Sequence, residues 1–246
     1  MSASTSAKRV PGAMASFPAT ELRIGGLVSL SSCDWPGELV ATVFCQGCPW
    51  RCRYCHNRHL LAADAPGQIT WLSVMRLLSR RVGLLDGVVF SGGEPTLQPG
   101  LAAAMRDVRA IGLRVGLHTA GPFPERLAEV LPLVDWVGFD VKAPFDSYER
   151  VTGVPGSGLR SRESLEHLLA SGTAYEVRTT VHPLLLDESA LAELGDALAT
   201  MGVAHYAVQA FRSTGCQDDE LNRGVGASPA RLPERVVKRL VNVASR

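Results

Sequence analysis

Short apolar runs alternate along the chain with segments whose apolar residues recur every three or four positions. The run 87–90 is typical of a strand buried on both faces of a parallel sheet. Segment 71–82 predicts an amphipathic helix, which Thr70 can cap and Gly83 can end. Strands are expected at 39–45, 87–90, 113–118, 135–142, 174–182 and 204–211, with an edge strand at 24–30. Helices are expected at 71–82, 98–111, 123–132, 161–171, 187–201 and 229–243.

This strict alternation of strands and helices predicts an α/β fold with a parallel sheet and right-handed crossovers. Six units are too few for a closed barrel of eight strands, so we expect a partial, open (β/α)6 TIM-like barrel. No linker, repeat or low-complexity block divides residues 21–246, which are interpreted as a single domain. Residues 1–20 are rich in Ser and Ala and lack an apolar core segment, so they are interpreted as a disordered leader.

Composition narrows the function classes. The 25 Lys and Arg residues almost balance the 24 Asp and Glu residues, so no basic field indicates a nucleic acid or an anionic membrane. No apolar run approaches the ~20 residues that are needed to span a bilayer. Clustered cysteines without partners elsewhere favour a reducing compartment over a disulfide framework. We therefore expect a cytoplasmic protein.

The candidate chemistry is concentrated in the loop 45–57, where four of the six cysteines lie within eleven residues. Thiolates select zinc or iron–sulfur clusters over hard cations. Taken together, Cys45, Cys48, Cys52 and Cys55 could close a tetrahedral zinc site. Taken without Cys45, the spacing is C-x3-C-x2-C, which favours a [4Fe-4S] cluster with one open iron. Cys45 ends an apolar strand, so we expect its side chain to be buried and to pack as a small hydrophobic group.

Polar residues follow the expected strands at their carboxyl ends, where the active sites of such barrels gather. These stretches are 91–95, 118–121 and 140–144, together with Arg178, Thr180 and His182 on the strand 174–182. Side chains alternate along a strand, so Asp140 and Lys142 share one face, opposite the apolar residues that pack on helices.

We expect these polar faces to line a cavity that holds a charged ligand, because unpaired buried charges would cost many kcal/mol. The alternative is a dry core in which Lys142 pairs with Asp140 or Glu176. His182 is expected either to face the cavity or to have a structural role.

Two motifs together carry a family resemblance. The string from Gly47-Cys48 to Cys55-His56-Asn57, with Tyr54 before the last cysteine, and Gly92-Gly93-Glu94 about forty residues later resemble the radical S-adenosylmethionine (SAM) superfamily. Within it, the chain resembles the activases of glycyl-radical enzymes, over about residues 22–215. The resemblance implies one [4Fe-4S] cluster on Cys48, Cys52 and Cys55, with SAM bound at the open iron.

The same resemblance implies which residues contact the cofactor. Asp140 and Lys142 match the family's D-x-K motif, and Asp34-Trp35-Pro36-Gly37 resembles the activase element near the substrate loop. The residues expected at the cofactor are Tyr54, His56, Gly92, Gly93, Glu94, Thr119, Asp140, Lys142 and Arg178. Tyr54 and His56 are expected to flank the adenine, and Asp34 is expected near the substrate.

Two departures from the family pattern matter. His118 stands where related activases carry an aspartate that helps to hold a monovalent cation, so we hypothesise that a protonated His118 supplies that positive charge. Phe211 replaces a cofactor-contacting histidine of the activators of pyruvate formate-lyase. The second departure favours an anaerobic ribonucleotide reductase as the glycyl-radical partner. As a further partner, the resemblance implies a flavodoxin- or ferredoxin-type electron donor.

Two other classes remain open. One is a radical SAM enzyme that acts on a small molecule, as the 7-carboxy-7-deazaguanine synthases do. The other is a protein that is not an enzyme, with four thiolates that hold zinc or carry electrons to a partner.

Overall fold

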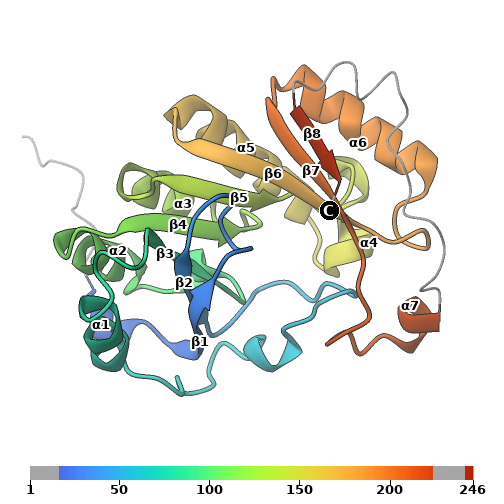
Figure 1. Cartoon of the computed structure of the whole chain (residues 1–246). Helices are drawn as coiled ribbons and strands as arrows, with labels where there is room; N and C mark the ends of the chain where they lie inside the picture. The colour runs from blue at the N-terminus through green and yellow to red at the C-terminus, as the bar shows by residue number, and fades with distance from the viewer. Residues whose placement is uncertain (1–16, 224–241, 246) are drawn as a thin grey trace, which may run out of the picture.

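The computed structural model of the chain describes residues 17–223 and 242–245. These residues form one sheet of eight strands in the order β1-β2-β3-β4-β5-β6-β7-β8, with helices on its outer side (Figure 1). The strands are β1 Ile24–Ser31, β2 Val40–Cys45, β3 Gly87–Gly92, β4 Arg114–Thr119, β5 Trp136–Asp140, β6 Ala174–Val181, β7 His205–Ala210 and β8 Asn242–Ser245. The α-helices are α1 Trp71–Ser79, α2 Leu101–Ala110, α3 Pro124–Val130, α4 Glu149–Thr152, α5 Ser157–Ser171, α6 Glu188–Thr200 and α7 Asp219–Arg223. Short 3-10 helices are η1 Ala19–Glu21, η2 Arg58–Leu60, η3 Pro95–Leu97, η4 Leu131–Leu133 and η5 Phe145–Ser147.

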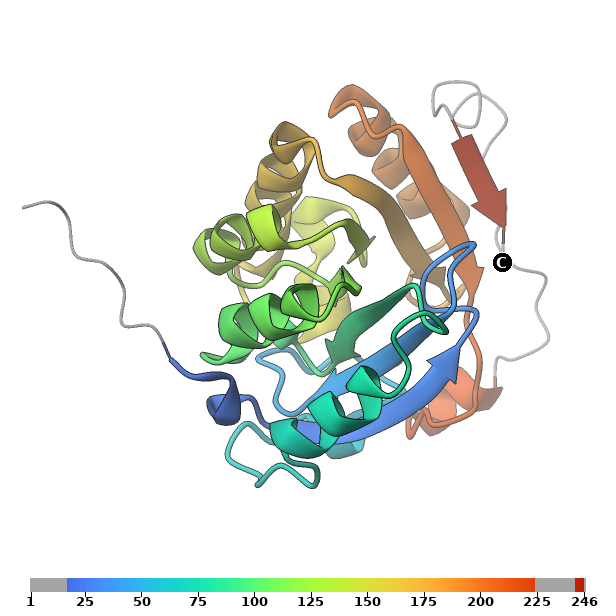
Figure 2. The same ribbon diagram turned by 60° about the vertical axis from the view of Figure 1, so that its left-hand side comes forward.

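The sheet is an open, partial barrel. Strand β1 is antiparallel to β2, and every later neighbouring pair is parallel. In the described part of the chain, no pairing joins β1 to β8, so the curved sheet has two free edges (Figure 2). The predicted single-domain α/β fold with an incomplete parallel barrel is therefore confirmed.

The six predicted parallel strands correspond to β2–β7, and the predicted edge strand is β1. The Thr70 side chain accepts a hydrogen bond from the backbone of Ser73, as a helix cap should. The helix expected at 229–243 is wrong at its end, because residues 242 and 243 belong to β8, a seventh parallel strand. Its residues 229–241 lie outside the described residues. So do residues 1–16 of the expected leader, whereas Ala19 is buried in η1.

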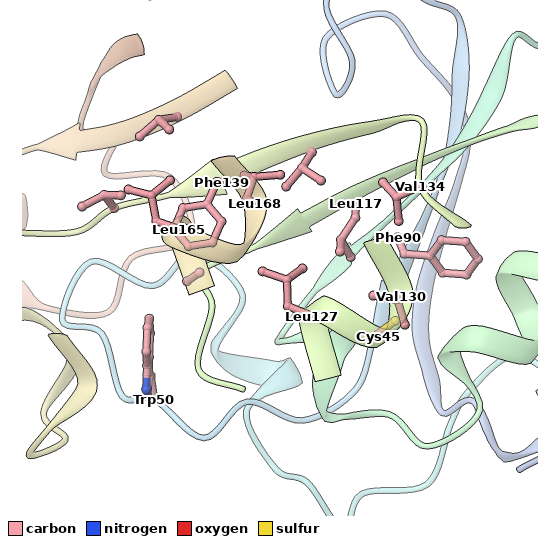
Figure 3. Packing of buried hydrophobic residues seen from close by; sticks show 14 of the residues in the cluster. Cys45, Trp50, Phe90, Leu117, Leu127, Val130, Val134, Phe139, Leu165 and Leu168 are labelled. Carbon is pink, nitrogen blue, oxygen red and sulfur yellow. The ribbon is translucent and has the colours of Figure 1, made fainter. Parts of the chain in front are cut away.

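The main core fills the space between the sheet and its helices. Figure 3 shows part of this cluster, in which Phe90, Leu117 and Phe139 of the sheet accompany Leu127 of α3 and Leu165 of α5. These side chains belong to the apolar face of each strand, opposite the polar face that alternation predicts. The polar face is thereby turned toward the inside of the barrel.

A second, inner core lies inside the barrel and consists of Trp35, Val40, Val89 and Trp136. The rings of Trp35 and Trp136 stack with their centroids 5.5 Å apart. Gly116 on β4 makes room for this pair, since a Cβ there would lie 2.9 Å from the Trp35 ring. The loop between β1 and β2 therefore inserts one aromatic ring, that of Trp35, into the barrel, where it stacks on Trp136 of β5.

Candidate active site

A cavity of about 210 Å³ lies at the carboxyl ends of the parallel strands. Strand register brings polar positions to this end, because Asp140 pairs with Arg178 and His118 pairs with Gly138. Twelve of the thirteen predicted site residues line the cavity. These are Cys48, Cys52, Tyr54, Cys55, His56, Gly92, Gly93, Glu94, Thr119, Asp140, Lys142 and Arg178.

The cysteine loop is fixed to neighbouring segments by its backbone. Cys48 donates its N–H to the Leu61 carbonyl at 3.2 Å, and Gly47 donates to Leu60 at 2.7 Å. Further along, Arg51 donates its N–H to the Thr152 carbonyl in α4 at 2.8 Å. The three thiols that line the cavity are thus carried by a loop with a defined conformation at one rim.

Cys45 lies apart from those three thiols. It is fully buried in the main core, beside the sheet residues shown in Figure 3, and it does not line the cavity. Burial, with the nearby charge of Glu94, raises the pKa of the Cys45 thiol strongly. Cys45 therefore packs as a small, buried hydrophobic side chain, as its position at the end of an apolar strand predicts.

The four thiols do not converge on one point. Among the described residues, no group of three or more His, Cys, Asp or Glu side chains is arranged to hold a single metal ion. A structural zinc needs its four ligands within about 2.3 Å of the metal, whereas in a cubane each thiolate binds a different iron. The separation of Cys45 from Cys48, Cys52 and Cys55 therefore fits the three-thiolate donor set.

Gly92 and Gly93 connect β3 to the cysteine loop at close range. A Cβ on Gly92 would lie 2.5 Å from the Cys45 nitrogen, and one on Gly93 would lie 2.3 Å from the Gly47 carbonyl oxygen. Gly92 also has a positive φ of 109°, which favours glycine. The family resemblance places this pair at the cofactor, and the protein's own backbone already requires glycine at both positions.

Glu94 joins two of the loops that line the cavity. Its Oε1 accepts hydrogen bonds from the backbone and hydroxyl of Thr96 and from the Thr119 hydroxyl at 2.8 Å. Its Oε2 accepts the N–H of Ala120 at 3.2 Å. Burial raises the pKa of this carboxyl group, while these donors act in the opposite direction. The loops after β3 and β4 are thereby held together.

The opposite wall of the cavity carries charged side chains. The Arg178 guanidinium donates from Nε to Asp140 Oδ1 at 3.0 Å, and its Nη2 lies 2.9 Å from the same oxygen. Lys142 Nζ lies 3.8 Å from Asp140 Oδ2 and 5.5 Å from the Tyr54 ring centroid. Burial acts to raise the pKa of Asp140, but the two cations outweigh it and lower that pKa. The pairing of Lys142 with Asp140 is present, yet it borders a cavity and not a dry core.

His118 does not supply the positive charge that we hypothesised. Its Nε2 lies 2.7 Å from the carbonyl oxygen of Asp34 and 3.2 Å from Arg178 Nη1, and its Nδ1 lies 3.1 Å from Ser91 Oγ. Burial and the adjacent guanidinium lower its pKa to about 4, so the imidazole is neutral at pH 7. The fixed cation at this position is Arg178.

Asp34 is the one predicted site residue that does not line the cavity. Its Oδ2 accepts a hydrogen bond from the Thr42 hydroxyl at 2.6 Å, and its carbonyl faces His118. His182 has a structural role, because its Nε2 lies 3.0 Å from the Leu221 carbonyl and it does not line the cavity. Phe211 packs edge-on against His182, with ring centroids 4.9 Å apart.

Other residues in the cavity lining, or packed directly behind it, had not been assigned to the site from the sequence. Trp50, inside the cysteine spacing, lines the cavity and packs edge-on against Tyr148 at 5.6 Å. The Tyr148 hydroxyl accepts the N–H of Lys142 at 3.0 Å and so supports the end of β5. Trp50 could have been predicted from its position between Cys48 and Cys52 in the cysteine motif, but no pattern in the sequence distinguishes Tyr148.

This geometry can now be compared with known proteins. Residues 42–198 match the profile of the radical SAM superfamily, and this segment contains the cysteine loop and every strand from β3 to β6. The chain belongs to the radical SAM superfamily. It is 31% identical over 171 residues to the pyruvate formate-lyase-activating enzyme of Clostridium pasteurianum, covering 67% of this chain and 71% of the relative.

A second relative is MJ1227 of Methanocaldococcus jannaschii, which is assigned to the glycyl-radical enzyme activating enzymes. It is 28% identical over 208 residues, covering 81% of this radical SAM protein and 84% of the relative. Among solved structures, QueE from Escherichia coli matches with a TM-score of 0.55 and 17% identity, covering 92% of this chain and 93% of that one. The match to QueE, at 17% identity, shows the fold alone.

Members of the superfamily are enzymes that bind a [4Fe-4S] cluster and SAM, and the donor set described above fits both. SuiB of Streptococcus suis, solved with S-adenosylmethionine bound, has the same fold, with a TM-score of 0.61 at 14% identity over 82% of this chain and 48% of that chain. Among the described residues, the structure contains no helix that is long and apolar enough to cross a membrane.

Proposed function

We propose that this radical SAM enzyme is an activase that generates a glycyl radical on a partner enzyme, and that the partner is anaerobic ribonucleoside-triphosphate reductase. The observation that carries the activase proposal is that three thiols of one loop and the polar ends of β3–β6 line the same cavity. The similarity to two activating enzymes supports the same class of reaction. The preference for the reductase rests on Phe211, which replaces the histidine of pyruvate formate-lyase activators.

In this proposal, Cys48, Cys52 and Cys55 would hold the cluster, and because Cys45 is buried away from the cavity, one iron would be left for SAM. When bound and reduced, the cluster and SAM supply a 5′-deoxyadenosyl radical that can abstract a glycine Cα hydrogen. The rest of the chemistry is positioning. Lys142 places a cation on the cavity wall, and Tyr54 and His56, which line the same cavity, would flank the adenine.

The remaining residues keep the cavity in shape. Glu94 ties the loops after β3 and β4 together, and Asp140 orients Arg178. Trp50 gives the cavity an apolar wall and is 2% exposed. The partner's glycine loop would enter through the open side of the incomplete barrel. A flavodoxin- or ferredoxin-type protein would supply the electron, and a cytoplasmic location stays a prediction.

Anaerobic reconstitution with iron and sulfide tests the proposal in three steps. We expect about four irons per chain, as one cubane requires, then release of 5′-deoxyadenosine on reduction with SAM, then a glycyl radical on the reductase detected by electron paramagnetic resonance. Cys52→Ala should abolish all three results, whereas Cys33→Ala, at an exposed cysteine, should abolish none.

The outcomes separate the candidate functions. Zinc in place of iron would overturn the enzyme assignment. Release of 5′-deoxyadenosine without a radical on the reductase, but with one on pyruvate formate-lyase, would overturn the choice of partner. Cleavage of SAM without a radical on either protein would favour a small-molecule substrate.

A further inference from the structure

The loop between β1 and β2 does not itself line the cavity, but it contacts a residue that does, His118 on β4. Ser32, Cys33, Pro36 and Gly37 of this loop are exposed, whereas Trp35 is buried against Trp136. The carbonyl oxygen of Asp34, which lies between Cys33 and Trp35 in the chain, is 2.7 Å from His118 Nε2. His118 lines the cavity, so it connects an exposed loop with the floor of the candidate active site.

His118 Nε2 faces two groups that make opposite demands on it. The Asp34 carbonyl can only accept a hydrogen bond, so at 2.7 Å it requires a proton on Nε2. Arg178 Nη1, at 3.2 Å, can only donate, so it requires a lone pair on the same atom. A neutral imidazole can meet one of these demands at a time. The shorter distance favours the carbonyl while the loop is docked.

Ser91 allows either state. Its hydroxyl can donate to an unprotonated Nδ1 or accept from a protonated one, across the same 3.1 Å contact. Gly138 provides the space for this arrangement, since a Cβ there would lie 2.8 Å from Arg178 Cζ and 2.9 Å from His118 Cδ2. Asp140 holds Nε and Nη2 of Arg178 in both states, so only Nη1 changes its partner.

We propose that His118 is a positioning residue for Arg178, and that the docking of loop 32–37 sets how many N–H groups of the guanidinium are free to donate to an anionic group in the cavity. With the loop docked, His118 carries its proton on Nε2, and Arg178 Nη1 is left to donate to a carboxylate of a ligand. With the loop displaced, the proton moves to Nδ1 and is donated to Ser91 Oγ. Nε2 then accepts one of the two N–H groups of Nη1, which leaves a single N–H there for the ligand and weakens its binding.

Nuclear magnetic resonance of ¹⁵N-histidine in the full chain, before and after cluster reconstitution, reports the tautomer directly. The His118 signals are identified by their loss in His118→Phe. We expect a neutral imidazole protonated on Nε2 at pH 7. A major Nδ1–H form, or a charged imidazolium, would overturn the proposal.

Two variants loosen the loop by different contacts. Thr42→Val removes the hydroxyl that donates to Asp34 Oδ2 at nearly constant volume, and Trp35→Leu removes the stack on Trp136. Each should make the Nδ1–H form the major one, while Thr200→Val, at a hydroxyl that bonds within α6, should not. If the Thr42→Val protein folds and keeps the wild-type tautomer, the loop does not set His118 and the proposal is wrong.

Two further measurements test the consequence for Arg178. Adding Ser91→Ala to Thr42→Val should reverse the tautomer shift, because the Nδ1–H form loses its acceptor; an unchanged shift would contradict the mechanism. Acetate, as the anionic probe, should perturb the Arg178 side-chain resonances of the wild type and of His118→Phe, and should do so less in Thr42→Val. Equal responses would overturn the link to Arg178. None of these results depends on glycyl radical formation. The inference about His118 can therefore fail while the proposed activase function stands, and the activase function can fail while the inference about His118 stands.

Discussion

Replacing Cys45 by alanine separates its packing role from a role as a metal ligand. The side chain is fully buried in the main core, so the variant removes one sulfur atom from a filled site. A group of roughly methylene size contributes about 0.8 kcal/mol by burial. A residual cavity on the order of 25 Å³ adds about 0.6 kcal/mol at ~24 cal/mol per Å³. We expect the free energy of unfolding to fall by about 1.5 kcal/mol.

The iron content should not change. Anaerobic urea denaturation of the cluster-free chain measures the stability loss, and iron and sulfide analysis after reconstitution measures the cluster. Cys45→Val, which refills the volume, should recover part of the stability and also keep about four irons per chain. Cys216→Ala is a matched control, because Cys216 is a second buried cysteine that does not line the cavity.

One result would refute this reasoning. If Cys45→Ala and Cys45→Val both lost the cluster, while Cys216→Ala kept it and all three variants remained folded, Cys45 would be a ligand. The open iron on which the proposed function depends would then not exist. Cys52→Ala must lose the cluster in the same experiment.

Three further predictions concern the surroundings of the site. First, the low pKa of His118, about 4 against an ordinary 6.5, means that the unfolded chain binds a proton there before the folded one does. Stability should therefore fall as the pH drops from about 6.5 to 4, by about 3 kcal/mol in total, and His118→Phe should show a shallower pH dependence in urea melts at each pH. Second, Gly116→Ala should destabilise the protein by about 1–3 kcal/mol through overpacking, and Trp35→Leu in the same chain should recover part of the loss; thermal melts that show additive losses would contradict this. Third, Arg53→Ala removes a partly exposed ion pair of 2.8 Å with Asp218. It should cost under about 1 kcal/mol and leave the iron content unchanged.

Local patterns in the sequence were sufficient to predict the parallel sheet and the place of the site. Buried strands such as β3 are continuous apolar runs, and their carboxyl ends meet at one edge, so the polar residues that follow them had to meet too. The same logic placed Cys45 inside the core and the other three cysteines of the loop at the rim. Strand β8 was missed, because residues 242 and 243 sit at the end of a segment with helical periodicity, and their pairing with β7 depends on the tertiary fold.

The charge of His118 could not be predicted from the sequence, because it depends on a contact between residues 60 positions apart. His118 was expected to carry a charge because it replaces an anionic residue of related proteins. In the fold, Arg178 reaches the same place from β6, and Gly138 leaves room for it. The reason for Gly92 and Gly93 was likewise hidden, since the backbone that they approach belongs to the cysteine loop.

The aromatic pair inside the barrel suggests a way to redesign the enzyme. Trp35 stacks on Trp136, and the Trp136 ring packs edge-on against His118, which lines the cavity. Smaller residues at these two positions would leave space next to His118, into which the cavity would extend. Bulkier molecules could then be admitted, although the loss of Trp35 would also loosen loop 32–37 and the contact with His118 that positions Arg178.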